Sequence, residues 1–209
     1  MSANDISIDL ETLGTSPRSA IIAIGAVRFS PITGEVDMEN TFYKRIDWNS
    51  ATRGRQVSGD TLRWWMGQSN EARKEITKGG NSTKQVLEEF YGWFPSGGKA
   101  WGNGAAFDVA MLEDALLQVG LVAPWKFWDV RDMRTVVAIG AGIADKNAIQ
   151  RAGTHHNALD DAAHQARTIA HIWRAVIGKN APPAVQNKPI AVTNLGPAPK
   201  SLSDDSFLD

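Results

Sequence analysis

The 209-residue sequence contains no cysteine, which excludes disulfides, thiolate metal sites and cysteine nucleophiles. Any metal ion must therefore be bound by oxygen or imidazole groups. No apolar run approaches the ~18 residues of a membrane span. The first residues, MSANDISIDL, have neither the basic patch nor the apolar segment of a signal peptide. These absences predict a cytoplasmic protein with no membrane partner.

An excess of charge of one sign is also missing, because 22 Lys and Arg stand against 23 Asp and Glu. A broad basic surface for long duplex nucleic acid is therefore not expected, although a short, local contact with nucleic acid stays open. The length predicts one domain, over residues 1–178. Residues 179–209 hold five of the nine prolines and end in the acidic SDDSFLD. This composition predicts an extended tail, which could dock on a protein partner.

Hydrophobic periodicity predicts strands that first meander and then alternate with helices. Three strands are expected over residues 5–11, 20–29 and 40–46, and two more over 99–102 and 125–129. Helices are expected over residues 59–66, 70–77, 83–94, 107–119, 132–139 and 157–177. This order predicts an α/β fold with a central mixed sheet of about five strands, flanked by helices.

Two acidic residues, Asp9 and Glu11, lie two positions apart in the first predicted strand. Their side chains leave the same face of that strand, where two carboxylates repel each other unless a cation or a proton lies between them. A divalent metal ion would resolve the repulsion. The alternative is a strand face that is simply solvated.

A third acidic residue, Asp108, follows the fourth predicted strand in the segment WGNGAAFDVAML. The small residues Gly102, Gly104 and Ala105 allow another group to approach the backbone there. Asp108 then begins a helix. The alternative role for this carboxylate is to interact favourably with the helix dipole.

The segment THHNALDDA, residues 154–162, contains two adjacent histidines and two adjacent aspartates. A histidine with an aspartate five positions later can be read as His155 with Asp160 or as His156 with Asp161. Helical phase does not choose between the two aspartates. If Asn157 is the N-cap, Asp160 takes the third helical position, where a carboxylate can reach back to the cap.

The three acidic segments together suggest a divalent metal site more strongly than each does alone. Oxygen ligands, a nearby imidazole and no cysteine favour Mg²⁺ or Mn²⁺. Sites that hold two such ions cleave phosphodiesters by activating water and stabilising the leaving oxygen. A histidine can accept the proton of that water at neutral pH.

Three motifs, IDLET at residues 8–12, NGAAFD at 103–108 and HNALDDA at 156–162, resemble those of the DEDDh 3′-to-5′ exonucleases, the DnaQ-like branch of the ribonuclease H-like superfamily. The resemblance spans about residues 5–177. Two further segments, TLRWWMGQSNEARKEI and KFWDVRDMRT, are similar to the phage exonuclease A type. The resemblance implies a ribonuclease H-like fold, two divalent cations and a bacterial or phage-infected cell.

The resemblance also implies the role of each site residue. Metal-binding carboxylates would be Asp9, Glu11, Asp108 and Asp161, with Asp9 contacting both ions, and the general base would be His156. The third motif of the family has Ala and Leu two and three positions after the histidine. Only His156 has them, as Ala158 and Leu159, so the resemblance selects the second register.

The expected substrate is the 3′ end of single-stranded nucleic acid, with DNA favoured and 5′-mononucleotides as products. Contacts with the terminal nucleotide are expected from Thr12, Leu13, Gly14 and Asn103. One of the adjacent residues Trp64 and Trp65 is also expected to contact it, and Trp65 is the residue that we predict. Adjacent residues on a helix point about 100° apart, so one tryptophan is expected in the core and the other on a base.

Other functions stay open at this point. The nearest alternative is an oligoribonuclease-like enzyme that trims RNA, since no residue demonstrably reads the 2′-hydroxyl. A catalytically silent nucleic-acid-binding module and a ribonuclease H that nicks internally are further alternatives. The four carboxylates argue against the silent module, because they would repel phosphate. A homodimer also stays open.

Overall fold

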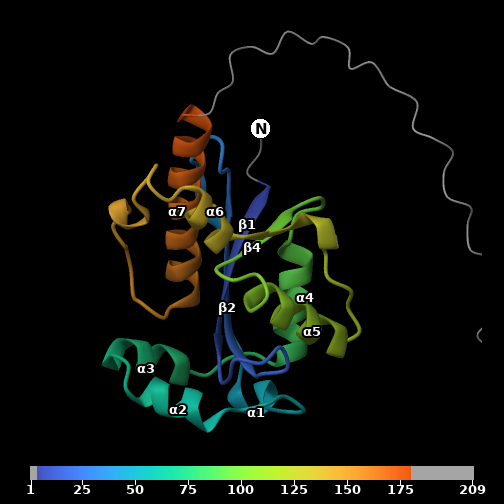
Figure 1. Cartoon of the computed structure of the whole chain (residues 1–209). Helices are drawn as coiled ribbons and strands as arrows, with labels where there is room; N and C mark the ends of the chain where they lie inside the picture. The colour runs from blue at the N-terminus through green and yellow to red at the C-terminus, as the bar shows by residue number, and fades with distance from the viewer. Residues whose placement is uncertain (1–3, 180–209) are drawn as a thin grey trace, which may run out of the picture.

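A computed structural model describes residues 4–179, which form a five-stranded mixed sheet of order β3-β2-β1-β4-β5 (Figure 1). The strands β1 (Asp5–Thr12), β2 (Ile21–Phe29) and β3 (Val36–Arg45) form an antiparallel meander. The strands β4 (Lys99–Gly102) and β5 (Val130–Asp132) extend the sheet in parallel with β1. The predicted α/β fold with a mixed five-stranded sheet is confirmed.

The alternation of β1 sends its apolar and acidic residues to opposite faces of the sheet. Ile6, Ile8 and Leu10 are buried in the larger hydrophobic cluster. Asp9 and Glu11 face the other way, and Glu11 is only 6% exposed. A solvated strand face is therefore the wrong interpretation of this pattern, because helices cover both faces of β1.

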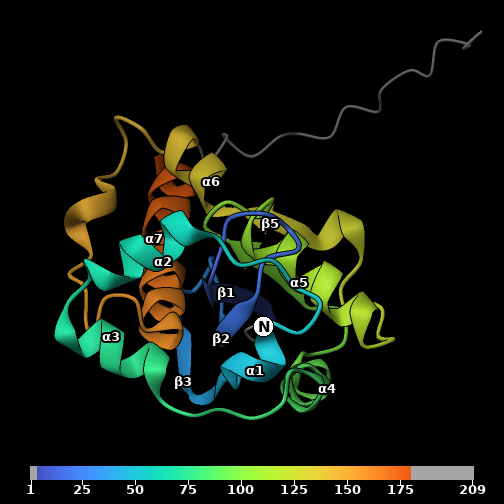
Figure 2. The ribbon, with the colours of Figure 1, turned by 90° about the horizontal axis from the view of Figure 1, so that it is seen from below.

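Helices cover the sheet on both sides (Figures 1 and 2). The first face carries α4 (Thr83–Trp93) and α5 (Asp108–Gln118), and the second carries α6 (Met133–Ile139) and α7 (Ala158–Lys179). Three more helices lie beyond the end of β1, namely α1 (Trp48–Ala51), α2 (Gly59–Met66) and α3 (Asn70–Thr77). Two short 3₁₀ turns, at Phe127–Asp129 and Lys146–Ala148, complete the described elements.

Serine residues fix the starts of α2, α3 and α4. The hydroxyls of Ser58, Ser69 and Ser82 each accept a hydrogen bond from the backbone N–H three residues later. This contact satisfies one of the free N–H groups of the first turn. The predicted bounds of α2 and α3 are correct, and the serine caps account for where the two helices begin.

The predicted strand over residues 125–129 is wrong. Trp125 is instead buried against Phe94, with ring centroids 5.1 Å apart, and its indole N–H donates to Glu113. Phe127 and Trp128 form an exposed turn, and the strand β5 follows them. The aromatic residues resemble a strand in composition, but they pack outside the sheet.

Two other predictions differ in detail. The strand β3 begins at Val36, four residues before the expected start at Asn40. For α7, the sequence predicts one apolar face, formed by Leu159, Ala163, Ala166, Ala170, Trp173 and Ile177. Ile177 is exposed, however, and Ile169 and Ile172, which lie outside this predicted face, are buried. The buried face of α7 is wider than one stripe because the helix contacts both the sheet and α6.

The predicted tail lies outside the described residues, apart from its first residue. Within residues 4–179, no helix is both long enough and apolar enough to cross a membrane.

Candidate active site

The first turn of α7 lies directly on the sheet at Gly25 in β2. A methyl group at Gly25 would lie 2.1 Å from the carbonyl carbon of Ala158, so any larger residue would collide with the helix backbone. Gly25 pairs with Asp9 across the antiparallel strands. The close approach therefore places the third motif beside the acidic residues of β1.

Three carboxylates meet at this junction. Asp9, Glu11 and Asp161 each offer an oxygen, and these oxygens lie within 4.8 Å of one another. Glu11 and Asp161 are buried, and Oε1 of Glu11 has no hydrogen-bond partner. A buried carboxylate oxygen without a partner beside two more carboxylates fits a hard divalent cation such as Mg²⁺ or Mn²⁺.

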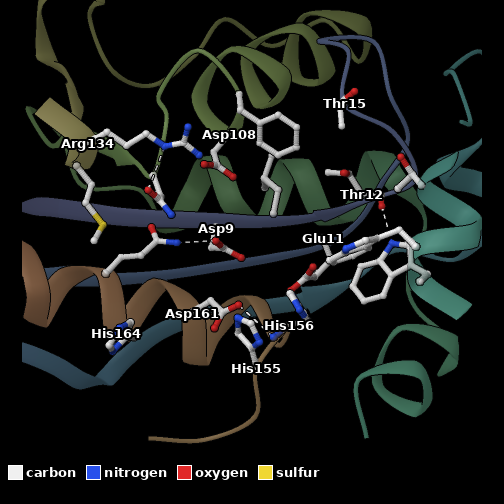
Figure 3. Close-up of a pocket in the computed structure, with 18 of the residues that line it drawn as sticks. Asp9, Glu11, Thr12, Thr15, Asp108, Arg134, His155, His156, Asp161 and His164 are labelled. Carbon is white, nitrogen blue, oxygen red and sulfur yellow. Dashed lines mark hydrogen bonds between the residues drawn. The ribbon is translucent and has the colours of Figure 1, made fainter. Parts of the chain in front are cut away.

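The fourth carboxylate, Asp108, begins α5 and is 3% exposed. Figure 3 shows Asp9 between Asp108 and Asp161. A methyl group at Gly102 would lie 3.3 Å from Oδ2 of Asp108. Gly102 therefore leaves space for the side chain of Asp108, which is the group that approaches the backbone at this point.

Burial raises the pKa values of Asp9, Glu11 and Asp108, and repulsion from neighbouring carboxylates adds to the shift for Asp9 and Glu11. Burial is the main cause for Asp9, with Asp108 and Glu11 adding to it, and the pKa of Asp9 lies well above its usual value. Burial and the charge of Asp108 raise the pKa of Glu11 to about 7. Burial also raises the pKa of Asp108 to about 7, against backbone hydrogen bonds that involve Leu10 and Asn103. A divalent cation would relieve the repulsion.

Both histidines of the third motif line the cleft, and His156 lies deeper. Its backbone N–H donates to Oδ2 of Asp161 at 3.1 Å, and its ring lies 4.9 Å from that of Trp64. Burial lowers the pKa of His156, and the charges of His155 and Arg151 lower it further. A lowered pKa favours the neutral imidazole of His156, the form that accepts a proton. His155 stacks on it, with ring centroids 3.9 Å apart.

The neighbouring Asp160 has a structural contact. Asn157 caps α7, as predicted, by accepting from the N–H groups of Leu159 and Asp160. The Asp160 carboxylate does not reach back to this cap as expected. It accepts from the N–H of Thr154 at 2.7 Å and lies over Gly153, where a methyl group would collide with it.

The carboxylates and histidines line a cleft of about 860 Å³. Of the predicted substrate contacts, Thr12, Gly14, Asn103 and Trp65 line it, whereas the Leu13 side chain is buried in the core. Trp65 is 4% exposed and donates its indole N–H to the carbonyl of Thr12. Trp64 is 47% exposed and also lines the cleft.

Two residues of the site were missed in the sequence. Gln165 is buried and donates from Nε2 to Oδ1 of Asp9 at 2.6 Å. It lies four residues after Asp161, on the same face of a helix, so helical spacing could have indicated it. Arg151 donates to Oδ1 of Asp161 from the loop before α7. No periodicity in that loop points to it.

The chain is similar in sequence to known exonucleases. Residues 4–173 match the sequence model of a family described as the 3′-5′ exoribonuclease Rv2179c-like domain. An exodeoxyribonuclease of Enterobacteria phage T4 is 28% identical over 157 residues, which cover 63% of this chain and 69% of the phage protein.

Solved structures share the fold. Pop2p of S. pombe, in its Mg²⁺ and Mn²⁺ bound form, is 18% identical, with a TM-score of 0.57 over 81% of this chain and 82% of that one. The RNase domain of the yeast Pop2 protein is 12% identical, with a TM-score of 0.52 over 86% of this chain and 79% of that one. The ribonuclease H-like fold and the membership of the exonuclease superfamily, both predicted from the three motifs, are confirmed.

Proposed function

Because the chain belongs to the 3′-5′ exoribonuclease Rv2179c-like domain family and is a 3′-to-5′ exonuclease, we propose that it degrades single-stranded nucleic acid, with DNA favoured, to 5′-mononucleotides. The observation that carries this proposal is the cluster of Asp9, Glu11 and Asp161 with its unpartnered oxygen. The similarity to a phage exodeoxyribonuclease supports DNA as the substrate.

The four carboxylates would hold two divalent cations, Mg²⁺ or Mn²⁺. Asp9 is central in the cluster, between Asp108 and Asp161 (Figure 3), so Asp9 would help to hold the ions together with these carboxylates and Glu11. When bound, such ions activate a water molecule and stabilise the leaving oxygen. The ions bound to Pop2p of S. pombe are consistent with this proposal.

His156 would act as the general base. The oxygen of a water molecule forms a bond to phosphorus, the bond from phosphorus to the 3′ oxygen of the chain breaks, and the water proton goes to the imidazole. The 3′ oxygen then takes a proton from solvent. The low pKa of His156 and its place in the cleft beside Asp161 support this role.

The terminal nucleotide would lie against the α2 side of the cleft. Trp64 has the exposed ring there, so Trp64 is proposed to stack on the base. Trp65 would act at the edge of the site, where it holds the backbone of Thr12. Thr12, Gly14 and Asn103 line the same cleft and are proposed to contact the nucleotide.

RNA is the second candidate substrate. The family description names an exoribonuclease, and one structural neighbour is an RNase domain. An oligoribonuclease-like activity would use the same carboxylates and the same histidine. The two candidates therefore differ only in how the cleft treats the 2′-hydroxyl.

A comparison of end-labelled substrates tests the proposal. We expect single-stranded DNA to be shortened from its 3′ end with Mg²⁺ or Mn²⁺, faster than duplex DNA or RNA, and Asp9→Asn to abolish the reaction. A faster reaction on RNA would favour the second candidate. Cleavage of a circular strand would indicate internal nicking, and binding without cleavage would indicate a silent module.

Self-association and a tail partner also stay proposals. Analytical ultracentrifugation of residues 1–209 and 1–178 tests the homodimer, and recovery of partners with each form tests docking of the tail.

A further inference from the structure

The loop between α6 and α7, residues 140–157, brings a guanidinium group into the acidic cluster. Nη1 of Arg151 donates to Oδ1 of Asp161, and the other oxygen of Asp161 accepts from the backbone of His156. The Arg151 side chain is 35% exposed and that of Asp161 is 11% exposed. The ion pair therefore lies at the wall of the cleft, between solvent and the buried carboxylates.

Arg151 stands apart from the other basic residues near the site. Among the ion pairs of residues 4–179, this is the only one that engages Asp9, Glu11, Asp108 or Asp161. Arg134 also lines the cleft, but it donates to the amide oxygen of Asn103. Arg151 thus occupies the position where a cation would bind Asp161.

A guanidinium and a divalent cation on the same oxygen of Asp161 repel each other, so each weakens the binding of the other there. An ion bound at Asp161 would therefore favour the transfer of Arg151 to another anionic partner or to water. The scissile phosphate would bring anionic oxygens to the same cluster. The planar guanidinium matches such oxygens in geometry and in charge.

We propose that Arg151 exchanges Asp161 for the scissile phosphate when metal and substrate enter, and so contacts the substrate during hydrolysis. This inference rests on the proposed exonuclease function. Arg151 would then stabilise the charge that develops on the phosphate oxygens in the transition state. Two glycines with positive φ, Gly142 and Gly153, allow turns in the loop that carries it.

The exchange predicts opposite effects on metal binding and on hydrolysis. Removing the guanidinium removes a competitor for Asp161, so divalent ions should bind more tightly. It also removes a phosphate contact, so substrate binding and cleavage should become weaker. A merely structural role for Arg151 would weaken both.

The test compares full-length wild type, Arg151→Gln, Arg151→Lys and the control Arg174→Gln. Arg174 is exposed on α7, outside the loop that carries Arg151, and does not line the cleft. Calorimetry measures Mn²⁺ binding without nucleic acid. Fluorescence anisotropy measures single-stranded DNA binding in Ca²⁺, and single-turnover kinetics at saturating Mn²⁺ measure cleavage of an end-labelled strand.

For Arg151→Gln we expect Mn²⁺ binding about 3- to 10-fold tighter, weaker DNA binding and cleavage about 10²- to 10³-fold slower. Arg151→Lys should recover part of the cleavage rate, and Arg174→Gln should resemble wild type. Weaker Mn²⁺ binding, or unchanged DNA binding and cleavage in Arg151→Gln, would overturn the proposal. If wild type cleaves nothing, the proposed function fails, while Mn²⁺ and DNA binding still decide whether Arg151 makes the exchange.

Discussion

At the scale of single residues, His156 has a backbone conformation that residues other than glycine rarely adopt. Its φ is +64°, and it is the only non-glycine residue with positive φ among the described residues. This conformation is tolerated by Asn better than by most residues. The positive φ of His156 turns the chain from the loop into α7, and the imidazole of His156 lines the cleft there.

The first prediction follows from that conformation. His156→Asn should keep the backbone and lower the turnover number by about 10²- to 10⁴-fold, because no general base remains. Calorimetry should show that Mn²⁺ binding is kept. The matched variant His155→Asn should retain most of the activity. If His155→Asn is the damaging change, the other register is correct.

The second prediction concerns Gln165, which holds Asp9 by one hydrogen bond. Gln165→Leu keeps the size of the side chain but leaves Oδ1 of Asp9 without its donor. Residues that orient metal ligands change affinity by about 10- to 100-fold. We expect a loss of Mn²⁺ affinity in that range, measured by calorimetry.

The control for this change is Gln85→Leu, at an exposed position on α4. It should leave Mn²⁺ affinity as in wild type. Equal affinities for Gln165→Leu and wild type would show that Gln165 does not position Asp9.

At the scale of secondary-structure elements, the contact between β2 and α7 sets the geometry of the site. The third prediction is that Gly25→Ala lowers the free energy of unfolding by about 1–3 kcal/mol, because the added methyl group forces the backbone of Ala158 away. Urea denaturation measures this change. Activity should fall as well, since Asp161 moves with the helix.

Gly92→Ala is the matched control, because Gly92 lies inside α4 with open space around it. This change should raise the free energy of unfolding by about 0.5–1 kcal/mol. A stable, active Gly25→Ala protein would show that α7 is free to shift.

Elements defined by local signals could be predicted from the sequence. The serine caps delimit α2 and α3, and the alternation of β1 separates its core residues from its acidic residues. The segment around Trp125 misled the prediction because an aromatic run is typical of both a strand and a packed turn. Its role depends on tertiary contacts with Phe94 and Glu113.

The candidate site divides in the same way. The carboxylates of the three motifs meet as expected, because Asp9 and Glu11 lie in the second half of β1 and Asp108 and Asp161 lie in the first turns of α5 and α7. Helical spacing could have indicated that Gln165 lies near Asp161, but no pattern in the sequence predicts its contact with Asp9 or the contact of Arg151 with Asp161. Gln165 and Arg151 reach Asp9 and Asp161 through the packing of α7 and of the loop before it.

At the scale of the whole molecule, the acidic cluster links folding to pH. The pKa of Glu11 rises from 4.5 to about 7, and that of Asp108 rises from 3.8 to about 7. Between about pH 4 and pH 7 these two carboxyl groups therefore bind more protons in the folded protein than in the unfolded chain. In this window their contribution to the free energy of unfolding falls as the pH rises, whereas the lowered pKa values of His155, His156 and His164 act in the opposite direction.

The fourth prediction is that the metal-free protein becomes less stable from pH 5 to pH 7.5, while the Mn²⁺-bound protein does so much less. Bound ions favour the charged carboxylates and so oppose the loss. Thermal melting with a chelator and with Mn²⁺ measures the difference. The difference in melting temperature between the Mn²⁺-bound and the metal-free wild-type protein should increase with pH.

A double variant, Glu11→Gln with Asp108→Asn, provides the control. It removes two of the three carboxyl groups whose pKa values are raised, so its melting temperature without metal should depend less on pH. The same slope in this variant and in wild type would assign the effect to other groups.

The close contact between Gly25 and the backbone of Ala158 also limits which substitutions position 25 can accept. Gly25 has no side chain to bind or react, and it lies more than a hundred positions from the third motif in the chain. In a scan of every substitution that selects for nuclease activity, we nevertheless expect position 25 to tolerate as little change as Asp9. Position 25 is therefore important to this enzyme because it must carry no side chain.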